Sequence, residues 1–343
     1  MKRLLNTLYV TTEGARLRKD GETIAVEIDG RVVKRSPAHL LGQIVMFGET
    51  SASPDAMHFA AQAGISMAWL GYSGKLMARI EGPQSGNVLL RRAQHRATAD
   101  PAAALPVARA VVAAKIANQR SILRRHMRDY PKTPGLAEID GAQRRLGDAA
   151  RLALETSGLD ALRGQEGEAA NAYWSVFDRL ILVTDPAFTF AGRNRRPPRD
   201  ATNALLSFLY ALVALDTRAA CEAHGLDPQM GFLHRDRPGR MSLALDVLEE
   251  LRAPLADRIA LSLINRRQLT ARDFENQETG AVLLTEHGRR TVLQAYHDRK
   301  RVELRHAWLD ERLPLGLVAQ IQVQLLARHL RGDIDGYPAW VWG

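Results

Sequence analysis

The chain has 343 residues, enough for two domains, and its 46% hydrophobic and 25% charged residues are typical of a soluble globular protein. Its single cysteine excludes a disulfide framework and a thiolate metal site, and it fits a reducing, cytoplasmic setting. Lys and Arg number 47 against 38 Asp and Glu, which favours a polyanionic partner such as nucleic acid without establishing one.

The first part of the chain has the pattern of β structure. Asp-Gly pairs at 20–21 and 29–30 are typical hairpin turns, and the apolar run 43–47 is a further strand. A Ser-Pro pair at 53–54 is typical of a capped helix start. We therefore predict a β-rich N-terminal domain over residues 1–85.

From residue 86 onward, helical periodicity dominates and strand signals nearly vanish. The longest apolar stretch, 204–215, is too short to span a bilayer, so we expect no membrane association. The predicted fold class is α+β, with the β-rich domain followed by a larger all-α catalytic domain over 86–343.

A glutamate begins an apolar helix face. On a helix over 165–180, Glu166 shares its face with Ala170, Tyr173 and Phe177. A buried carboxylate costs several kcal/mol unless a cation or hydrogen-bond donors compensate for it. Alternatively, Glu166 lies in a solvated first turn.

A basic loop precedes the next helix, which is predicted over 201–224 with Asp200 as its N-cap. The loop contains four arginines within seven residues: Arg193, Arg195, Arg196 and Arg199. It is either a solvated loop or a DNA-binding loop that contacts phosphates. Its place in the sequence between Glu166 and His234 favours phosphate binding.

The third feature combines a histidine with two acids. His234 follows an apolar turn, and the helix predicted over 242–251, with Ser242 as N-cap, is largely apolar apart from Asp246 and Glu249 on one face. Either this face is solvated and the histidine is structural, or a cation lies beside them. Together with the acid at 166, such a set favours Mg²⁺ or Mn²⁺.

These blocks resemble a known family, the CRISPR-associated adaptation integrases and endonucleases called Cas-one. The matching segments are Leu162-Arg163-Gly164-Gln165-Glu166, Gly192-Arg193-Asn194-Arg195-Arg196-Pro197-Pro198 and Gly231-Phe232-Leu233-His234, followed by Asp246 and Glu249. The resemblance extends over most of the chain, because the order of a β domain and then a helical domain is also shared.

The resemblance implies that Glu166, His234 and Glu249 are the catalytic metal ligands. Asp246 matches an additional nearby acid, which either supports these ligands from behind or occasionally binds the metal itself. Some members of the family carry Asp at the closing position, so Glu249 is a permitted variant. The family also implies a homodimer, assembly with the small second CRISPR-associated protein (Cas-two), and insertion of short double-stranded DNA into a CRISPR array.

The implied reaction is transesterification, in which a DNA 3′-hydroxyl attacks a phosphodiester and no protein nucleophile is needed. Water in place of the hydroxyl gives nuclease activity. Two other functions stay open: a non-catalytic DNA-binding scaffold, and a general structure-selective repair nuclease. The aromatic segment 337–342 is either an exposed patch or a tail packed on its own domain.

Overall fold

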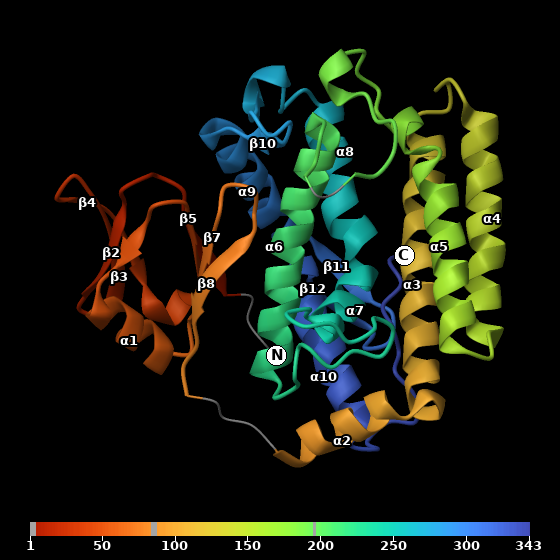
Figure 1. The fold of residues 1–343 in the computed structure, drawn as a ribbon, viewed down its shortest axis with the longest axis horizontal. Coiled ribbons are helices and arrows are strands. Elements are labelled where there is room, and N and C mark those ends of the chain that lie inside the picture. Colours follow the sequence, from red (N-terminus) through yellow and green to blue (C-terminus); the bar gives the residue numbers. More distant parts are fainter. Residues whose placement is uncertain (1–4, 84–87, 195–196) are drawn as a thin grey trace.

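The computed structural model describes residues 5–83, 88–194 and 197–343. A strand-rich N-terminal part lies beside a larger helical part, as Figure 1 shows. The predicted order of strands followed by helices is confirmed.

The N-terminal part contains two four-stranded sheets, ordered β1-β5-β7-β8 and β4-β3-β2-β6. In the first sheet, β5 pairs in parallel with both β1 and β7, which places its apolar residues at the centre. The strands are β1 Asn6–Val10, β2 Arg16–Asp20, β3 Thr23–Ile28, β4 Arg31–Pro37, β5 Leu41–Phe47, β6 Ser51–Ala52, β7 Ser66–Leu70 and β8 Leu76–Ile80.

Local sequence signals set the turns and the helix of this part. Asp29 and Gly30 have φ of 50° and 74°, the left-handed pair that a two-residue hairpin turn requires between β3 and β4. Helix α1 (Pro54–Gln62) begins where Ser53 Oγ accepts a hydrogen bond from the Ala56 N–H, at 3.2 Å. Both predictions are confirmed.

The helical part is built around two long, buried helices, α3 and α6. The helices are α2 Val88–Ala99, α3 Pro101–Asp129, α4 Leu136–Glu155, α5 Leu159–Trp174, α6 Ala201–Ala223, α7 Ser242–Leu251, α8 Arg258–Asn265, α9 Glu286–Arg301 and α10 Val318–Leu330. A π-helical segment, Arg252–Asp257, joins α7 to α8. Such segments are frequent at functional sites.

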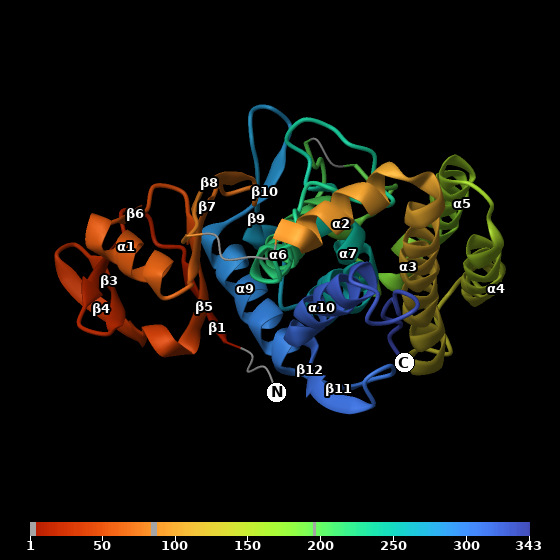
Figure 2. The same ribbon diagram turned by 90° about the horizontal axis from the view of Figure 1, so that it is seen from below.

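Helix α6 connects the two parts. It begins where Asp200 Oδ1 accepts a hydrogen bond from the Asn203 N–H, at 2.7 Å, as predicted. Phe208 of α6 stacks on Phe47 of β5, with ring centroids 5.8 Å apart, and Figure 2 shows α6 between the sheets and α3. By length and composition α6 is the one described helix that could cross a membrane, but 61% of its apolar window is buried inside the protein.

The helical part also carries two small antiparallel strand pairs that the periodicity did not predict. These strands are β9 Phe274–Asn276 with β10 Val282–Leu284, and β11 Glu303–His306 with β12 Glu311–Pro314. The prediction that the part after residue 86 is all-α is therefore wrong in detail, although helices make up most of it.

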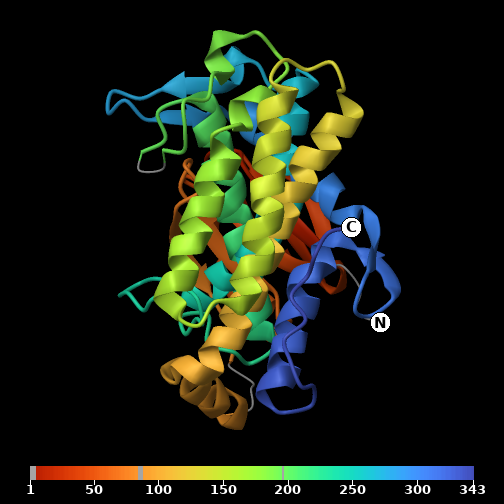
Figure 3. The same cartoon turned by 90° about the vertical axis from the view of Figure 1, so that its right-hand side faces the viewer.

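The C-terminal tail packs on its own protein. Trp340 is 2% exposed, and the backbone N–H of Trp342 donates to Asn118 Oδ1 of α3 at 2.7 Å. Figure 3 shows this end of the chain against the helical part. Of the two alternatives for the aromatic segment, the packed tail is therefore correct.

Candidate metal centre

Helix α7 lies deep in the helical part, and its acidic side chains are buried. Asp246, Glu249 and Glu250 are 1%, 3% and 0% exposed, because α7 packs against α3, α6 and α10. Buried carboxylates persist only where donors or cations surround them. The alternative of a solvated acidic face is thus excluded.

The loop before α7 encloses the carboxylate of Asp246. The backbone N–H groups of Phe232, Leu233 and His234 donate to Asp246, at 2.6, 3.0 and 3.1 Å. A Cβ at Gly231 would lie 2.8 Å from Asp246 Oδ2, so this close approach requires glycine. Both carboxylate oxygens are therefore saturated by the loop.

The predicted helix cap on this element is wrong. Met241, not Ser242, holds the N-cap position of α7, and no side chain caps the helix there. Instead, Ser242 Oγ donates to the carbonyl oxygen of Arg235 at 3.3 Å. The hydroxyl thus fastens the loop that carries the histidine.

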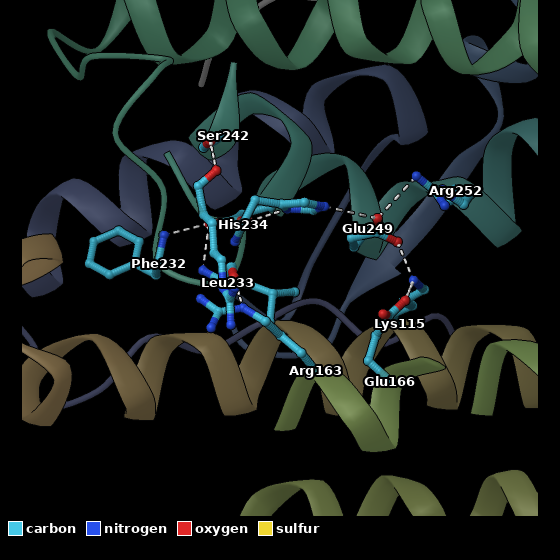
Figure 4. A network of polar contacts seen from close by, with 11 residues as sticks. Lys115, Arg163, Glu166, Phe232, Leu233, His234, Ser242, Glu249 and Arg252 are labelled. Carbon is cyan, nitrogen blue, oxygen red and sulfur yellow. Dashed lines mark hydrogen bonds and ion pairs between the residues drawn. The ribbon is translucent and has the colours of Figure 1, made fainter. Parts of the chain in front are cut away.

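The same carboxylate orients the imidazole of His234. Nδ1 of His234 lies 2.6 Å from Asp246 Oδ1, and since a carboxylate only accepts, we assign the hydrogen to Nδ1. In the neutral imidazole, Nε2 then presents a lone pair, and it lies 3.9 Å from Glu249 Oε1. Figure 4 shows the ring directed at Glu249. Metal-binding histidines in proteins are held by a carboxylate in this way.

A lysine ammonium links Glu166 to Glu249. Lys115 of α3 is 5% exposed, its Nζ donates to Glu166 Oε1, and the same Nζ lies 2.8 Å from Glu249 Oε2 (Figure 4). Helix α5 begins at Leu159, so Glu166 lies in mid-helix and not in a solvated first turn. Glu166 and Glu249 therefore share one cation, with His234 beside Glu249.

Arg252, the first residue of the π-helical segment, is a second cation beside Glu249. Its guanidinium lies 3.0 Å from Glu249 Oε1 and 4.6 Å from the ring centroid of Tyr210. Burial opposes the charge on Glu249, but Arg252 and Lys115 outweigh it and lower the pKa of Glu249 to about 2. The carboxylate is therefore ionised at neutral pH.

Arg163 ties the two elements that carry Glu166 and His234. Its Nε donates to the carbonyl oxygen of Leu233 at 2.8 Å, so α5 is fastened to the loop before α7. Asp160 accepts from Arg163 and from Arg235, at 2.6 and 2.7 Å, and strengthens the same junction. Residues 70 positions apart in the sequence are thus held in register.

The arginine loop reaches the same region through Arg193. This side chain points into the protein, donating to Asn203 Oδ1 and, at 3.3 Å, to Ser207 Oγ. Its guanidinium lies 5.2 Å from the ring centroid of Tyr210, the ring that Arg252 also covers. Arg193 therefore adds positive charge near the acids while it fixes the start of α6.

Of the other three arginines of the loop, the structure describes only Arg199. Arg199 is exposed, and its backbone N–H donates to Asn194 Oδ1 at 2.8 Å. Arg195 and Arg196 lie outside the described residues. DNA binding by this loop stays a prediction.

Sequence reasoning missed Lys115 and Arg252. A signal for Lys115 was present, because the lysine interrupts an apolar run, Val111 to Ile116, on a helix that periodicity indicates. The logic that singled out Glu166 as a polar residue on an apolar face applies equally to this lysine. Arg252 has no comparable signal, since an arginine after an apolar helix is ordinary.

The donors at this site fit a hard divalent ion. Within the described ranges, no three acidic, histidine or cysteine side chains are close enough to bind one ion as they stand, because Lys115 lies between Glu166 and Glu249. However, Glu249 Oε2 is buried and receives no hydrogen bond of good geometry, and Nε2 of His234 lies 3.9 Å from Oε1 of the same carboxylate. Two carboxylates and one imidazole suit Mg²⁺ or Mn²⁺.

Curated relatives resemble the chain along its whole length. It is 53% identical over 346 residues to "CRISPR-associated endonuclease Cas1 2" of Rhodospirillum rubrum, and 47% identical over 342 residues to "CRISPR-associated endonuclease Cas1 1" of Chlorobaculum tepidum. Each alignment covers 100% of both chains.

Solved structures share the fold. A Cas1 protein from Thermotoga maritima matches with a TM-score of 0.80 and 24% identity, covering 95% of this chain and 97% of that one. A casposase bound to integration product matches with a TM-score of 0.82 and 21% identity, covering 97% and 93%. A Cas6-RT-Cas1–Cas2 complex matches with a TM-score of 0.81 and 21% identity, covering 100% of this chain and 36% of that chain.

A family profile gives the same result. Residues 8–298, most of the chain, match the family described as "CRISPR associated protein Cas1". The two relatives that are about half identical align with the whole chain, so both the strand-rich part and the helical part are covered. The chain therefore belongs to the Cas1 family of CRISPR-associated proteins.

Proposed function

We propose that this chain is a metal-dependent DNA integrase and endonuclease of CRISPR adaptation, and that Glu166, His234 and Glu249 bind Mg²⁺ or Mn²⁺. The observation that carries the proposal is that Lys115 bridges Glu166 of α5 and Glu249 of α7, while Nε2 of His234 lies 3.9 Å from the same Glu249 side chain. The family and the names of its endonuclease members support the activity.

In the proposed integration, the 3′-hydroxyl of a short DNA attacks a phosphodiester of the array. The attacking hydroxyl gives up its proton to solvent as a new P–O bond forms. The bond to the neighbouring 3′-oxygen breaks, and that oxygen leaves with the electron pair and takes up a proton from solvent. A bound divalent ion supplies stabilisation of the charge that develops on the phosphate. Water as the attacking group gives strand cleavage.

The chain's own residues position the reacting groups. Asp246 keeps Nδ1 of His234 protonated and the ring fixed, while Arg252 keeps Glu249 charged. Arg199, which is exposed, would contact the DNA backbone, and such a contact positions DNA without reading its sequence. The one cysteine, Cys221, is buried, and burial raises its pKa, so it is no candidate nucleophile.

The proposal includes the partners that the family suggests: double-stranded DNA, a second copy of the chain, and Cas2, in the cytoplasm. The support is that a protein of the same fold was solved in a complex with Cas2, and that a casposase of the same fold was solved with its integration product. The net charge of +9 suits a DNA partner.

Glu166→Gln and His234→Ala should each lower strand joining and cleavage at least 100-fold, because each removes a proposed metal ligand. The assay joins a short duplex to array DNA with Mn²⁺ or with EDTA, and DNA affinity should change less than threefold. Glu168→Gln is the matched control, since Glu168 is exposed on the same helix.

The same assay separates the alternatives. Full strand joining by folded Glu166→Gln protein, or joining that EDTA does not stop, would overturn the proposed metal centre. DNA binding by the wild type with neither joining nor cleavage, with or without Mn²⁺, would indicate a scaffold. Equal cleavage of unrelated DNA, without joining to the array, would indicate a general repair nuclease.

A further inference from the structure

Lys115 occupies the position that a metal ion bound by Glu166 and Glu249 would need. Its ammonium contacts both carboxylates, and its side chain is 5% exposed. We propose that Lys115 is a built-in counter-cation that holds the two carboxylates together in the metal-free protein, competes with the divalent ion for them, and is displaced when the ion binds. This inference rests on the proposed metal site.

The need for a resident cation follows from burial. Glu249 is 3% exposed and Glu166 is 27% exposed on its side chain, so water screens their mutual repulsion poorly. Arg252 balances only one oxygen of Glu249, Oε1, at 3.0 Å. The ammonium of Lys115 neutralises the remaining charge and links helices α5 and α7 through the two carboxylates.

The ammonium and a divalent ion cannot share this place. Mg²⁺ binds carboxylate oxygens at about 2.0–2.1 Å, and the Lys115 nitrogen lies 2.8 Å from Glu249 Oε2. An ion bound to the same oxygen would meet the ammonium at short range, where two positive charges repel strongly. Figure 4 shows Lys115 directly between the two glutamates.

Of the two cations at the site, Lys115 is the one that can withdraw. The lysine ammonium ends a flexible four-carbon stem, whereas the planar guanidinium of Arg252 is held over the Tyr210 ring at 4.6 Å. Arg252 and His234 then stay as fixed neighbours of the ion. Metal binding at this centre is thus weaker than its ligands alone would give.

The test measures Mn²⁺ affinity of the full chain by calorimetry, without DNA. Lys115→Met should bind Mn²⁺ at least about tenfold more tightly than the wild type, because no charge competes. Its melting temperature in EDTA should fall, and Mn²⁺ should raise it by more than it raises that of the wild type. Lys115→Arg keeps a charge and should not tighten binding.

The matched control is Lys300→Met. Lys300 is another largely buried lysine, 11% exposed on its side chain and 2.6 Å from Asp216, away from the centre. The Lys300→Met variant should be less stable than the wild type but should bind Mn²⁺ with the same affinity. If Lys115→Met does not fold, Lys115→Gln makes the same comparison, since the amide is neutral.

Failure of this inference and of the proposed site give different results. One result would overturn the counter-cation role alone: the wild type binds Mn²⁺, Glu166→Gln abolishes this binding, and neither Lys115→Met nor Lys115→Gln tightens it. If neither the wild type nor the neutral variants bind Mn²⁺, both the metal site and the inference are wrong.

Discussion

Asp246 and Glu249 are buried one helical turn apart, but their surroundings suit them to different tasks. Three backbone N–H groups and an imidazole fill the oxygens of Asp246, so it has little capacity left to bind an ion. Glu249 instead faces two side-chain cations and the free side of His234. We infer that Asp246 positions the histidine, while Glu249 is available as a ligand.

Asp246→Asn tests this division. The amide cannot accept from all four donors, so His234 loses its fixed orientation, and we expect Mn²⁺ affinity and strand joining to fall about 10–100-fold. Raising the Mn²⁺ concentration should restore much of the activity of this variant and none of that of Glu166→Gln. Equal rescue of both variants would contradict a positioning role.

Asp257, at the end of the π-helical segment, gives a pH-dependent contribution to stability. It is 0% exposed, and burial raises its pKa from 3.8 to about 6, although hydrogen bonds from Tyr210 and Tyr173 and the charge of Arg252 oppose the shift. Since the folded pKa lies above the unfolded one, the protonated form is favoured in the fold. This contribution is fully present below about pH 4 and is lost as the pH rises through 6.

Asp257→Asn removes the titration. Between about pH 4.5 and about pH 7.5, the wild type should lose about 2 kcal/mol of unfolding free energy that the variant does not lose. Urea unfolding of both proteins at the two pH values measures the difference. A gap between variant and wild type that stays constant with pH would show that Asp257 is ionised throughout.

Among the site residues, the sequence predicted those that interrupt an apolar helix face by themselves. Glu166, Asp246 and Glu249 stand out as acids on apolar helix faces, and the structure brings Glu166 and Glu249 to one cation. Lys115 broke a pattern in the same way but was overlooked. Arg252 could not be found, because its role depends on a π-helical turn that residue types do not specify.

At the scale of elements, short apolar signals and turn chemistry predicted the N-terminal strands and α1, whereas the small strand pairs were missed. Strand β11, Glu303–His306, has the sequence Glu-Leu-Arg-His, and only its last residue is buried. Such a strand has no apolar alternation in its sequence, and its pairing with β12 defines it. Its existence is decided by tertiary structure.

The C-terminal tail and α7 form one unit through Glu250. The hydroxyl of Tyr337, the backbone N–H of Trp340 at 2.6 Å and Nε2 of Gln322 at 2.9 Å all donate to this buried carboxylate. Glu250 follows Glu249 in the chain, so the tail supports the helix that carries a proposed ligand.

Tyr337→Phe should therefore destabilise the protein by about 1–3 kcal/mol, because it removes one hydrogen-bond partner from a buried carboxyl group. Thermal and urea unfolding measure the loss. Tyr130→Phe is the control: Tyr130 is 44% exposed, and its variant should stay within about 0.5 kcal/mol of the wild type. Equal stability of the two variants would mean that Glu250 does not need the tail.

For the whole molecule, composition and element order predicted the α+β architecture, but they did not reveal how closely its parts are joined. Val45 and Phe47 of β5 and Ala68 and Leu70 of β7 belong to the same apolar cluster as the helices of the larger part, while a second cluster lies among the N-terminal strands and α1. The division at residue 85 thus stays a prediction, because a boundary in sequence need not separate two cores.

The packing of the tail has a consequence for biosynthesis. Trp340 fills the core and Trp342 is bonded to α3, yet both are made after every residue of the centre. While the ribosome still holds these residues, Glu250 has lost two of its donors and α7 has an open flank. The nascent chain therefore cannot complete the support of its acidic helix until Trp342 has been made and has left the ribosome.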